Sequence, residues 1–156
     1  MDEELKTWLG DVLNDPITSI LLKYSNLTKT QFESLVIDLA TENLSINGLK
    51  YEEKAKVRSK TVSRGSFNRS LSQARKNIIA SIYTVLLLSY VGLLRGSVFE
   101  EYETLAGRLQ DYTALYTTYA QNRGAQTNLI RNIERELFEA VEKLAKPKVL
   151  RPPKIL

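Results

Sequence analysis

The chain has 156 residues, of which 43% are hydrophobic and 26% are charged, so it is long enough to bury one hydrophobic core or two small ones. It contains no cysteine, which excludes disulfides and thiolate metal sites, and no histidine, which removes the commonest general base and a common metal ligand. We therefore expect a protein that is not an enzyme and that carries no cofactor.

The net charge of +4 is unevenly distributed along the chain. Residues 1–49 hold eight acidic and three basic side chains, whereas residues 50–76 hold nine basic and two acidic ones. A basic segment beside an acidic one is typical of a nucleic-acid interface, because neutralising phosphates supplies most of the non-specific affinity. The plainer interpretation is that these lysines and arginines only solvate a helix.

Two short helices open the chain. Its acidic start, Met1 to Glu4, lacks the basic and apolar regions of a secretory signal, so we expect a cytoplasmic location. Asp15 and Pro16 predict a second helix, with Asp15 as its N-cap and Pro16 at its first position. Apolar side chains recur at helical spacing, which predicts one core-facing side for each helix. The expected core-facing residues are Leu5, Trp8 as an anchor, Leu9, Val12 and Leu13, then Ile17, Ile20, Leu21 and Tyr24.

Two further helices precede the most basic part of the chain. Thr28 and Gln31 form a capping-box pattern, which predicts a third helix from about Lys29. Phe32, Leu35, Val36 and Leu39 mark its expected inner side, and residues 43–48 are expected to form a connection. Residues 51–60 are lysine-rich and predict a fourth helix with Ala55 facing inward. Its lysines would contact phosphates and orient the protein on a nucleic acid.

Residues 62–94 organise the rest of the chain. Ser63 is placed as an N-cap, and apolar residues then follow at helical spacing on one side: Phe67, Leu71, Ala74 and Ile78. The other sides of this first half carry arginine, asparagine, glutamine, serine and lysine, the side chains that contact base edges and phosphates. The second half, residues 77–94, has no charged residue.

Part of this stretch resembles the recognition helix of the C-terminal promoter-reading domain of bacterial sigma factors, which runs roughly V-S-R-G-T-V and then L-S-R-A-R-K-K-L. This chain has Val62-Ser63-Arg64-Gly65-Ser66-Phe67 and Leu71-Ser72-Gln73-Ala74-Arg75-Lys76-Asn77-Ile78 at the same offsets. Leu27-Thr28, Gln31, Leu35 and Leu39 are similar to the first helix of that domain. Tyr51-Glu52-Glu53-Lys54-Ala55 is similar to its second helix, commonly Y-E-E-I-A, with Lys54 in place of a buried isoleucine. The resemblance covers residues 27–78 and implies a helix-turn-helix that enters the major groove.

The apolar run 78–94 is near the lower length limit of a membrane span and is diluted by Ser81, Thr84 and Ser89, so we expect a protein core or a dimer interface and no membrane. Gly92 and Gly96 are expected to end this helix. Apolar and tyrosine residues then recur at spacings of four and three from Val98 to Tyr119, which predicts the seam of a coiled coil or a helical hairpin.

A stop at Asn122-Arg123-Gly124 and a last helix over about 127–146 would complete the hairpin. Two interpretations stay open, a homodimer and a hairpin that closes on its own chain. The tail 147–156 is basic and proline-rich, and it would bind either phosphates or a protein partner.

The sequence thus predicts an all-α fold with a helix-turn-helix, a long central apolar helix and a C-terminal helical hairpin or coiled coil. The expected domains are 1–77 with the helix-turn-helix, 78–146 for packing or dimerisation, and the tail 147–156. The expected function is sequence-specific binding of double-stranded DNA by a transcriptional regulator; the alternative is a non-catalytic accessory subunit of a replication, repair or transcription complex. Base contacts are expected from Arg64, Ser66, Asn68, Arg69 and Gln73, and phosphate contacts from Lys54, Lys56, Arg58, Lys60, Arg75 and Lys76.

Overall fold

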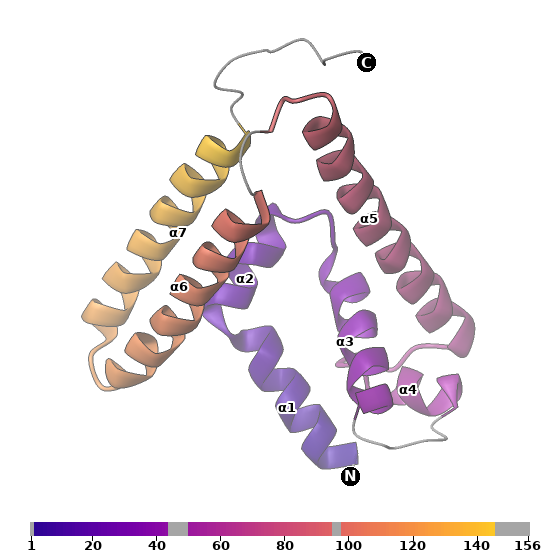
Figure 1. Cartoon of the computed structure of the whole chain (residues 1–156). Helices are drawn as coiled ribbons and strands as arrows, with labels where there is room; N and C mark the ends of the chain where they lie inside the picture. The colour runs from indigo at the N-terminus through magenta and orange to yellow at the C-terminus, as the bar shows by residue number, and fades with distance from the viewer. Residues whose placement is uncertain (1, 44–49, 95–97, 146–156) are drawn as a thin grey trace. The chain divides into compact units, whose positions relative to one another are not determined.

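The computed structural model describes residues 2–43, 50–94 and 98–145, which form seven α-helices and no strand (Figure 1). The predicted all-α class is therefore confirmed for this part of the chain. Residues 44–48 of the expected connection, Gly96 and the tail 147–156 lie outside the described residues. No described helix is both long and apolar enough to cross a membrane.

The chain divides into two compact units, Met1–Ser81 and Ile82–Leu156. The first contains α1 (Asp2–Asn14), α2 (Pro16–Tyr24), α3 (Lys29–Asn43), α4 (Tyr51–Val57) and most of α5 (Arg64–Tyr90). The second contains the end of α5 together with α6 (Val98–Thr118) and α7 (Arg123–Ala145). The division lies four residues beyond the predicted boundary at 77, and the single helix α5 runs through it.

Local hydrogen bonds begin the helices of the first unit where the sequence predicts. The Asp15 carboxylate accepts a hydrogen bond from the Thr18 N–H at 2.6 Å, and Pro16 is the first residue of α2. The Thr28 N–H donates to the Gln31 side chain at 3.0 Å, and the Gln31 N–H donates to the Thr28 hydroxyl at 3.2 Å. These bonds satisfy backbone donors that have no partner inside the helix, so the predicted caps of α2 and α3 are confirmed.

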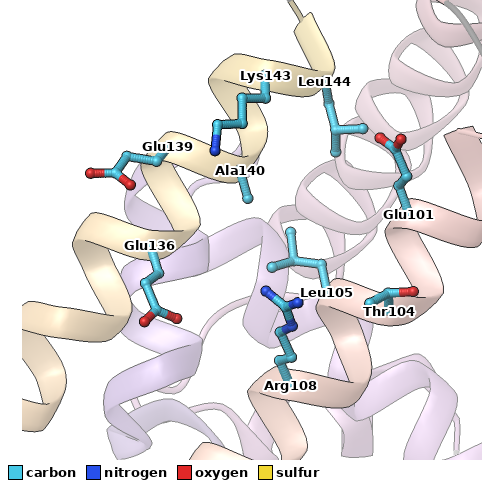
Figure 2. A pocket seen from close by; sticks show the side chains of 9 residues that line it. All are labelled: Glu101, Thr104, Leu105, Arg108, Glu136, Glu139, Ala140, Lys143 and Leu144. Carbon is cyan, nitrogen blue, oxygen red and sulfur yellow. The ribbon is translucent and has the colours of Figure 1, made fainter.

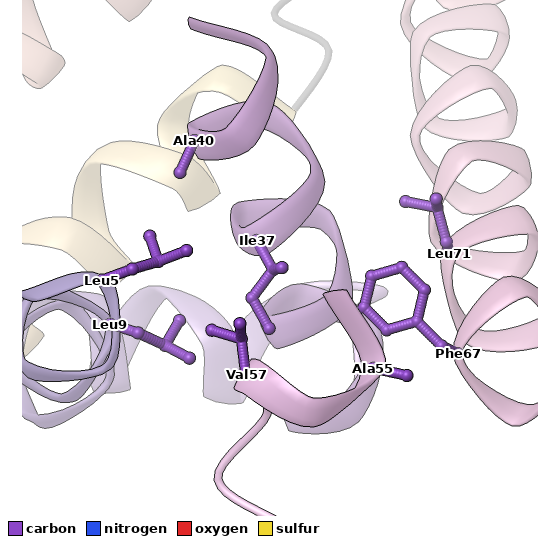
Figure 3. Close-up of a cluster of buried hydrophobic side chains, with 8 residues drawn as sticks. All are labelled: Leu5, Leu9, Ile37, Ala40, Ala55, Val57, Phe67 and Leu71. Carbon is purple, nitrogen blue, oxygen red and sulfur yellow. The ribbon is translucent and has the colours of Figure 1, made fainter. Parts of the chain in front are cut away.

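The core of the first unit is built where α1, α3, α4 and α5 meet (Figure 3). Ile37 and Phe67 are fully buried, and each such side chain contributes about 1.5–3 kcal/mol of transfer free energy. Because every one of the four helices supplies part of this cluster, α5 is fixed to α3 and α4 along its first half. The buried members are Leu5 and Leu9 from α1, Ile37 and Ala40 from α3, Ala55 and Val57 from α4, and Phe67 and Leu71 from α5.

Several predicted core positions are wrong. Trp8 is 46% exposed, Tyr24 is 57% exposed and Leu39 is 48% exposed, so none of them anchors the core. In α3 the buried side is polar as well as apolar, and it is rotated away from Leu39. It comprises Glu33, Ser34, Ile37, Asp38, Ala40 and Thr41. The spacing of apolar residues could not locate the buried side of α3, because two of its buried residues are the carboxylates Glu33 and Asp38, which are stabilised there by ion pairs.

The long helix α5 has well-formed ends. The Ser66 N–H donates to the Ser63 hydroxyl at 3.2 Å, so the predicted N-cap is confirmed. At the other end Gly92 has a φ of 75°, which favours glycine. Its N–H donates to the Ser89 carbonyl at 3.1 Å, and the Leu93 N–H donates to the Leu88 carbonyl at 2.9 Å. This pair of bonds is a Schellman motif, so Gly92 ends the helix as predicted.

In the second unit α6 and α7 lie side by side, joined by a short turn (Figure 1). Ile133 and Leu137 of α7 are buried, and Tyr112 of α6 donates a hydrogen bond from its hydroxyl to the Glu136 carboxylate. The predicted stop at residues 122–124 is wrong. The Asn122 side chain accepts a hydrogen bond from the Ala125 N–H at 3.0 Å and caps α7, which therefore begins at Arg123 rather than near residue 127.

Candidate nucleic-acid interface

Two carboxylates of α3 are buried beneath the basic segment. Asp38 is fully buried and accepts hydrogen bonds from Lys54 Nζ at 2.7 Å and from Arg75 Nη2 at 2.6 Å. Glu33 is 2% exposed and accepts from Arg58 Nε at 3.2 Å and from the Ser59 N–H. Buried charges are tolerated only when paired and hydrogen-bonded, so these contacts join α3 to α4, to the residues after α4 and to α5.

This ion network corrects part of the predicted site. Lys54 and Arg58 are each only 7% exposed, and their charged groups are directed to Asp38 and Glu33. Neither cation is therefore placed to hold a phosphate. Lys54 stands where the sigma-factor pattern has a buried isoleucine, and it is also buried. Asp38 of α3 neutralises its ammonium group.

The exposed bases and amides of α5 are not spread evenly around the helix. Because successive residues are about 100° apart, positions three, four and seven apart share one side. Four residues of this side line a hollow of about 300 Å³ together with Tyr51, Leu71 and Ile79. We define the basic face of α5 as Asn68, Arg69, Ser72, Arg75 and Lys76.

Two members of the basic face are exposed cations without an acidic partner among the described residues. Arg69 and Lys76 are exposed, and neither forms an ion pair with any residue that the structure describes. Arg75 is shared, since Nη2 binds Asp38 while its side chain remains 51% exposed. The ion pair with the buried Asp38 therefore holds the Arg75 guanidinium in place, and the rest of the Arg75 side chain stays accessible at the surface.

Asn68 supplies an unsatisfied group beside these cations. It is half-buried, and its Oδ1 finds no hydrogen-bond partner within the described part of the chain. This oxygen is itself buried, so its unfilled hydrogen bond lies inside the fold and is not offered to a ligand at the surface. Of this residue, only the exposed part of the side chain contributes to the basic face.

Other predicted contact residues lie elsewhere. Gln73 donates from Nε2 to the Asn77 side chain at 3.0 Å, and Asn77 donates to the Asn26 carbonyl at 2.8 Å. Gln73 therefore belongs to the contacts that hold α5 against the connection between α2 and α3. Ser66 is exposed on this same side, so the structure does not bring these two residues to the basic face.

Three predicted bases lie outside the basic face. Arg64 is exposed, and its Nη1 lies 3.7 Å from an oxygen of the equally exposed Glu52, a pair that contributes little. Lys56 of α4 and Lys60 after it are exposed. These side chains are accessible to phosphate, although they do not line the same hollow as the α5 residues.

A larger hollow of about 450 Å³ lies between α6 and α7 (Figure 2). Its walls carry both signs of charge, with Arg108 and Lys143 opposed by three glutamates, so it does not present a surface of one charge to a ligand. No group of side chains suited to hold a metal ion occurs in the described ranges. The full lining is Glu101, Thr104, Leu105, Arg108, Glu136, Glu139, Ala140, Lys143 and Leu144.

No family model, no curated protein and no solved structure matches this chain. The resemblance to a sigma-factor domain therefore remains a prediction from residues 27–78. A fold hosts many functions, so the function is argued from the chemistry of the basic face.

Proposed function

We propose that this protein binds double-stranded DNA, with the basic face of α5 directed into the major groove. The observation that carries the proposal is the arrangement of this helix. One side is fixed in the core by Phe67 and Leu71, while Arg69 and Lys76 project from another side without acidic partners among the described residues. An α-helix fits the major groove, and free cations on it supply the attraction to phosphate.

The two buried carboxylates of α3 support this proposal. Glu33 and Asp38 would cancel the positive charge if they were exposed, but both are buried and already neutralised. Lys56, Lys60 and Arg64 also remain exposed. The two buried acids therefore do not expose negative charge beside the basic face, although Glu52 and Glu53 of α4 are exposed. The exposed bases of α5 attract a polyanion to this helix.

Within the proposed complex the residues divide by chemistry. Arg69 is suited to a bidentate contact with guanine. Arg75, Lys76, Lys56 and Lys60 would bind phosphates and fix the orientation of the helix. A homodimer would offer two such helices to neighbouring half-sites.

The test compares two double variants by fluorescence anisotropy on duplex DNA across a range of salt concentrations. Arg69→Ala with Lys76→Ala removes two exposed bases of the basic face, and Arg123→Ala with Arg131→Ala removes two exposed bases of α7 as a charge-matched control. We expect the first variant to bind DNA more weakly and its salt slope to fall by about one for each phosphate that is no longer neutralised. Equal weakening in both variants would show that binding follows net charge and not the basic face.

Selection from random duplexes then separates a regulator from an accessory subunit. A recovered sequence motif that Arg69→Ala relaxes, at a cost of about 1–3 kcal/mol, is the result expected for a sequence-specific regulator. Equal binding to all duplexes and to single strands is the result expected for an accessory subunit that recognises charge alone.

A further inference from the structure

The apolar half of α5 carries large exposed side chains. Their spacings of three and four place them on one side of the helix, continuous with the basic face. Tyr83 is 69% exposed and Tyr90 is 86% exposed. We define the apolar stripe as Ile79, Ile82, Tyr83, Leu86, Leu87 and Tyr90.

The area of this stripe matches one side of a stable interface. With about 200 Å² for a fully exposed large side chain, the exposed fractions of its six members amount to roughly 700 Å². A standard protein–protein interface buries about 800 Å² on each partner. The largest apolar patch on a typical monomer is about 300–600 Å², so exposure of the whole stripe to water would be unusual.

We propose that the apolar stripe binds a second copy of this chain, with the two α5 helices antiparallel. A stripe that meets its own copy around a two-fold axis must be self-complementary. Residues 77–94 contain no charged side chain, so two copies meet there without repulsion between like charges. The surface consists of leucine, isoleucine and tyrosine, which pack well against one another at dimer interfaces.

The charges beside the stripe select the antiparallel orientation. Arg75 and Lys76 lie just before it, so a parallel pair would place these cations against the same cations of the second copy. In an antiparallel pair centred between Thr84 and Val85 they lie beside the C-terminal end of the second copy's α5, which carries partial negative charge and has no basic residue in its last turn. Arg95 is the one base that closely follows this end in the sequence, so the antiparallel pair avoids setting two cations against two.

Sedimentation velocity at micromolar concentration and without DNA tests the dimer independently of the proposed function. We expect the wild type to sediment as a dimer and Leu86→Glu to sediment as a monomer with unchanged helical content. Leu115→Glu alters a comparably exposed leucine of α6, 42% against 50%, and we expect it to remain dimeric. A monomeric wild type, or a dimer that survives Leu86→Glu, would overturn the proposal whatever the protein does with DNA.

Disulfide trapping tests the orientation, because the chain has no cysteine of its own. An equal mixture of Ile79→Cys and Tyr90→Cys should form a mixed disulfide, since these positions are opposite each other in the antiparallel pair. Tyr90→Cys alone should not cross-link, because its two copies are about 16 Å apart along the axis and a disulfide needs Cα atoms within about 7 Å. Efficient cross-linking of Tyr90→Cys alone would show a parallel pair and overturn the antiparallel arrangement.

Discussion

Replacement of Asp38 by asparagine should destabilise the first unit more than any surface substitution. Asp38 is fully buried, and the variant keeps its shape but removes the negative charge that faces Lys54 Nζ at 2.7 Å. Lys54 is itself only 7% exposed, so its ammonium group would be left as an uncompensated buried charge. Breaking a buried ion pair in this way costs about 3–5 kcal/mol. The other partner, Arg75, is half-exposed and can turn to solvent, so it adds little to this figure.

The assay is urea unfolding followed by tryptophan fluorescence. Trp8 is the only tryptophan of the chain and lies on α1, so the signal reports on the first unit alone. With a urea m-value of about 2 kcal/mol per molar, a loss of 3–5 kcal/mol lowers the midpoint by roughly 2 M. Glu52→Gln is the control, because its carboxylate is 63% exposed and pairs with Arg64 only at 3.7 Å. We expect this control to change the free energy of unfolding by less than about 0.5 kcal/mol.

A second substitution tests whether the unpaired Lys54 ammonium group causes the loss of stability in Asp38→Asn. Lys54→Met removes the stranded cation with a side chain of similar length, so Asp38→Asn with Lys54→Met should be more stable than Asp38→Asn alone. Lys54→Met by itself should cost less than Asp38→Asn, because Asp38 retains Arg75 as its partner at 2.6 Å. If Asp38→Asn costs less than about 1 kcal/mol, or if the double variant recovers nothing, then the buried ion network does not stabilise this unit as argued.

Two further predictions concern α5 and the α6–α7 hairpin. Ser63→Ala should lower the free energy of unfolding of the first unit by about 0.5–2 kcal/mol, measured by the same urea assay, whereas Ser63→Asp should retain most of the cap because its carboxylate also accepts from the Ser66 N–H. Tyr112 donates a hydrogen bond from its hydroxyl to Glu136, and this bond raises the pKa of Tyr112 above its ordinary value of 10.0. Burial and the negative charge of Glu136 raise this pKa further, whereas the positive charge of Arg108 lowers it. The raised pKa means that this stabilisation is complete below about pH 10 and is lost as the pH rises through the folded-state value, so Tyr112→Phe should flatten the alkaline part of the stability curve followed by circular dichroism.

Sequence patterns located most of the helices because their signals are local. The caps at Asp15, Thr28 and Ser63 depend on side chains within three residues of the backbone groups that they satisfy. Gly92 ends α5 because a positive φ is needed at that position. The stop predicted at Asn122 was wrong for a related reason. Asparagine is typical of a helix stop and also of an N-cap, and only the hydrogen bond from the Ala125 N–H distinguishes the two here.

The site was harder to predict because its determining contacts are distant in sequence. Asp38 is sixteen residues from Lys54 and thirty-seven from Arg75, so no local pattern shows that they meet. One signal was present in the resemblance itself, because a lysine in place of a buried isoleucine requires a buried acid nearby. The sequence predicted exposed cations on α5 correctly at Arg69 and Lys76, but it also assigned phosphate contacts to Lys54 and Arg58, which are buried.

Arg75 shows how the buried network and the basic face depend on each other. Ordering a long flexible side chain on binding costs free energy, and a side chain that is already ordered in the free protein avoids most of that cost. Asp38 holds Nη2 of Arg75 at 2.6 Å, while half of the side chain stays exposed beside Ser72 and Lys76. The buried carboxylate therefore positions one cation of the face in advance, whereas Arg69 and Lys76 must be ordered by the ligand. It follows that Asp38→Asn should weaken the proposed DNA binding even under conditions in which the variant remains folded, and that Arg75→Lys, which cannot reproduce the planar contact with Asp38, should share part of that loss.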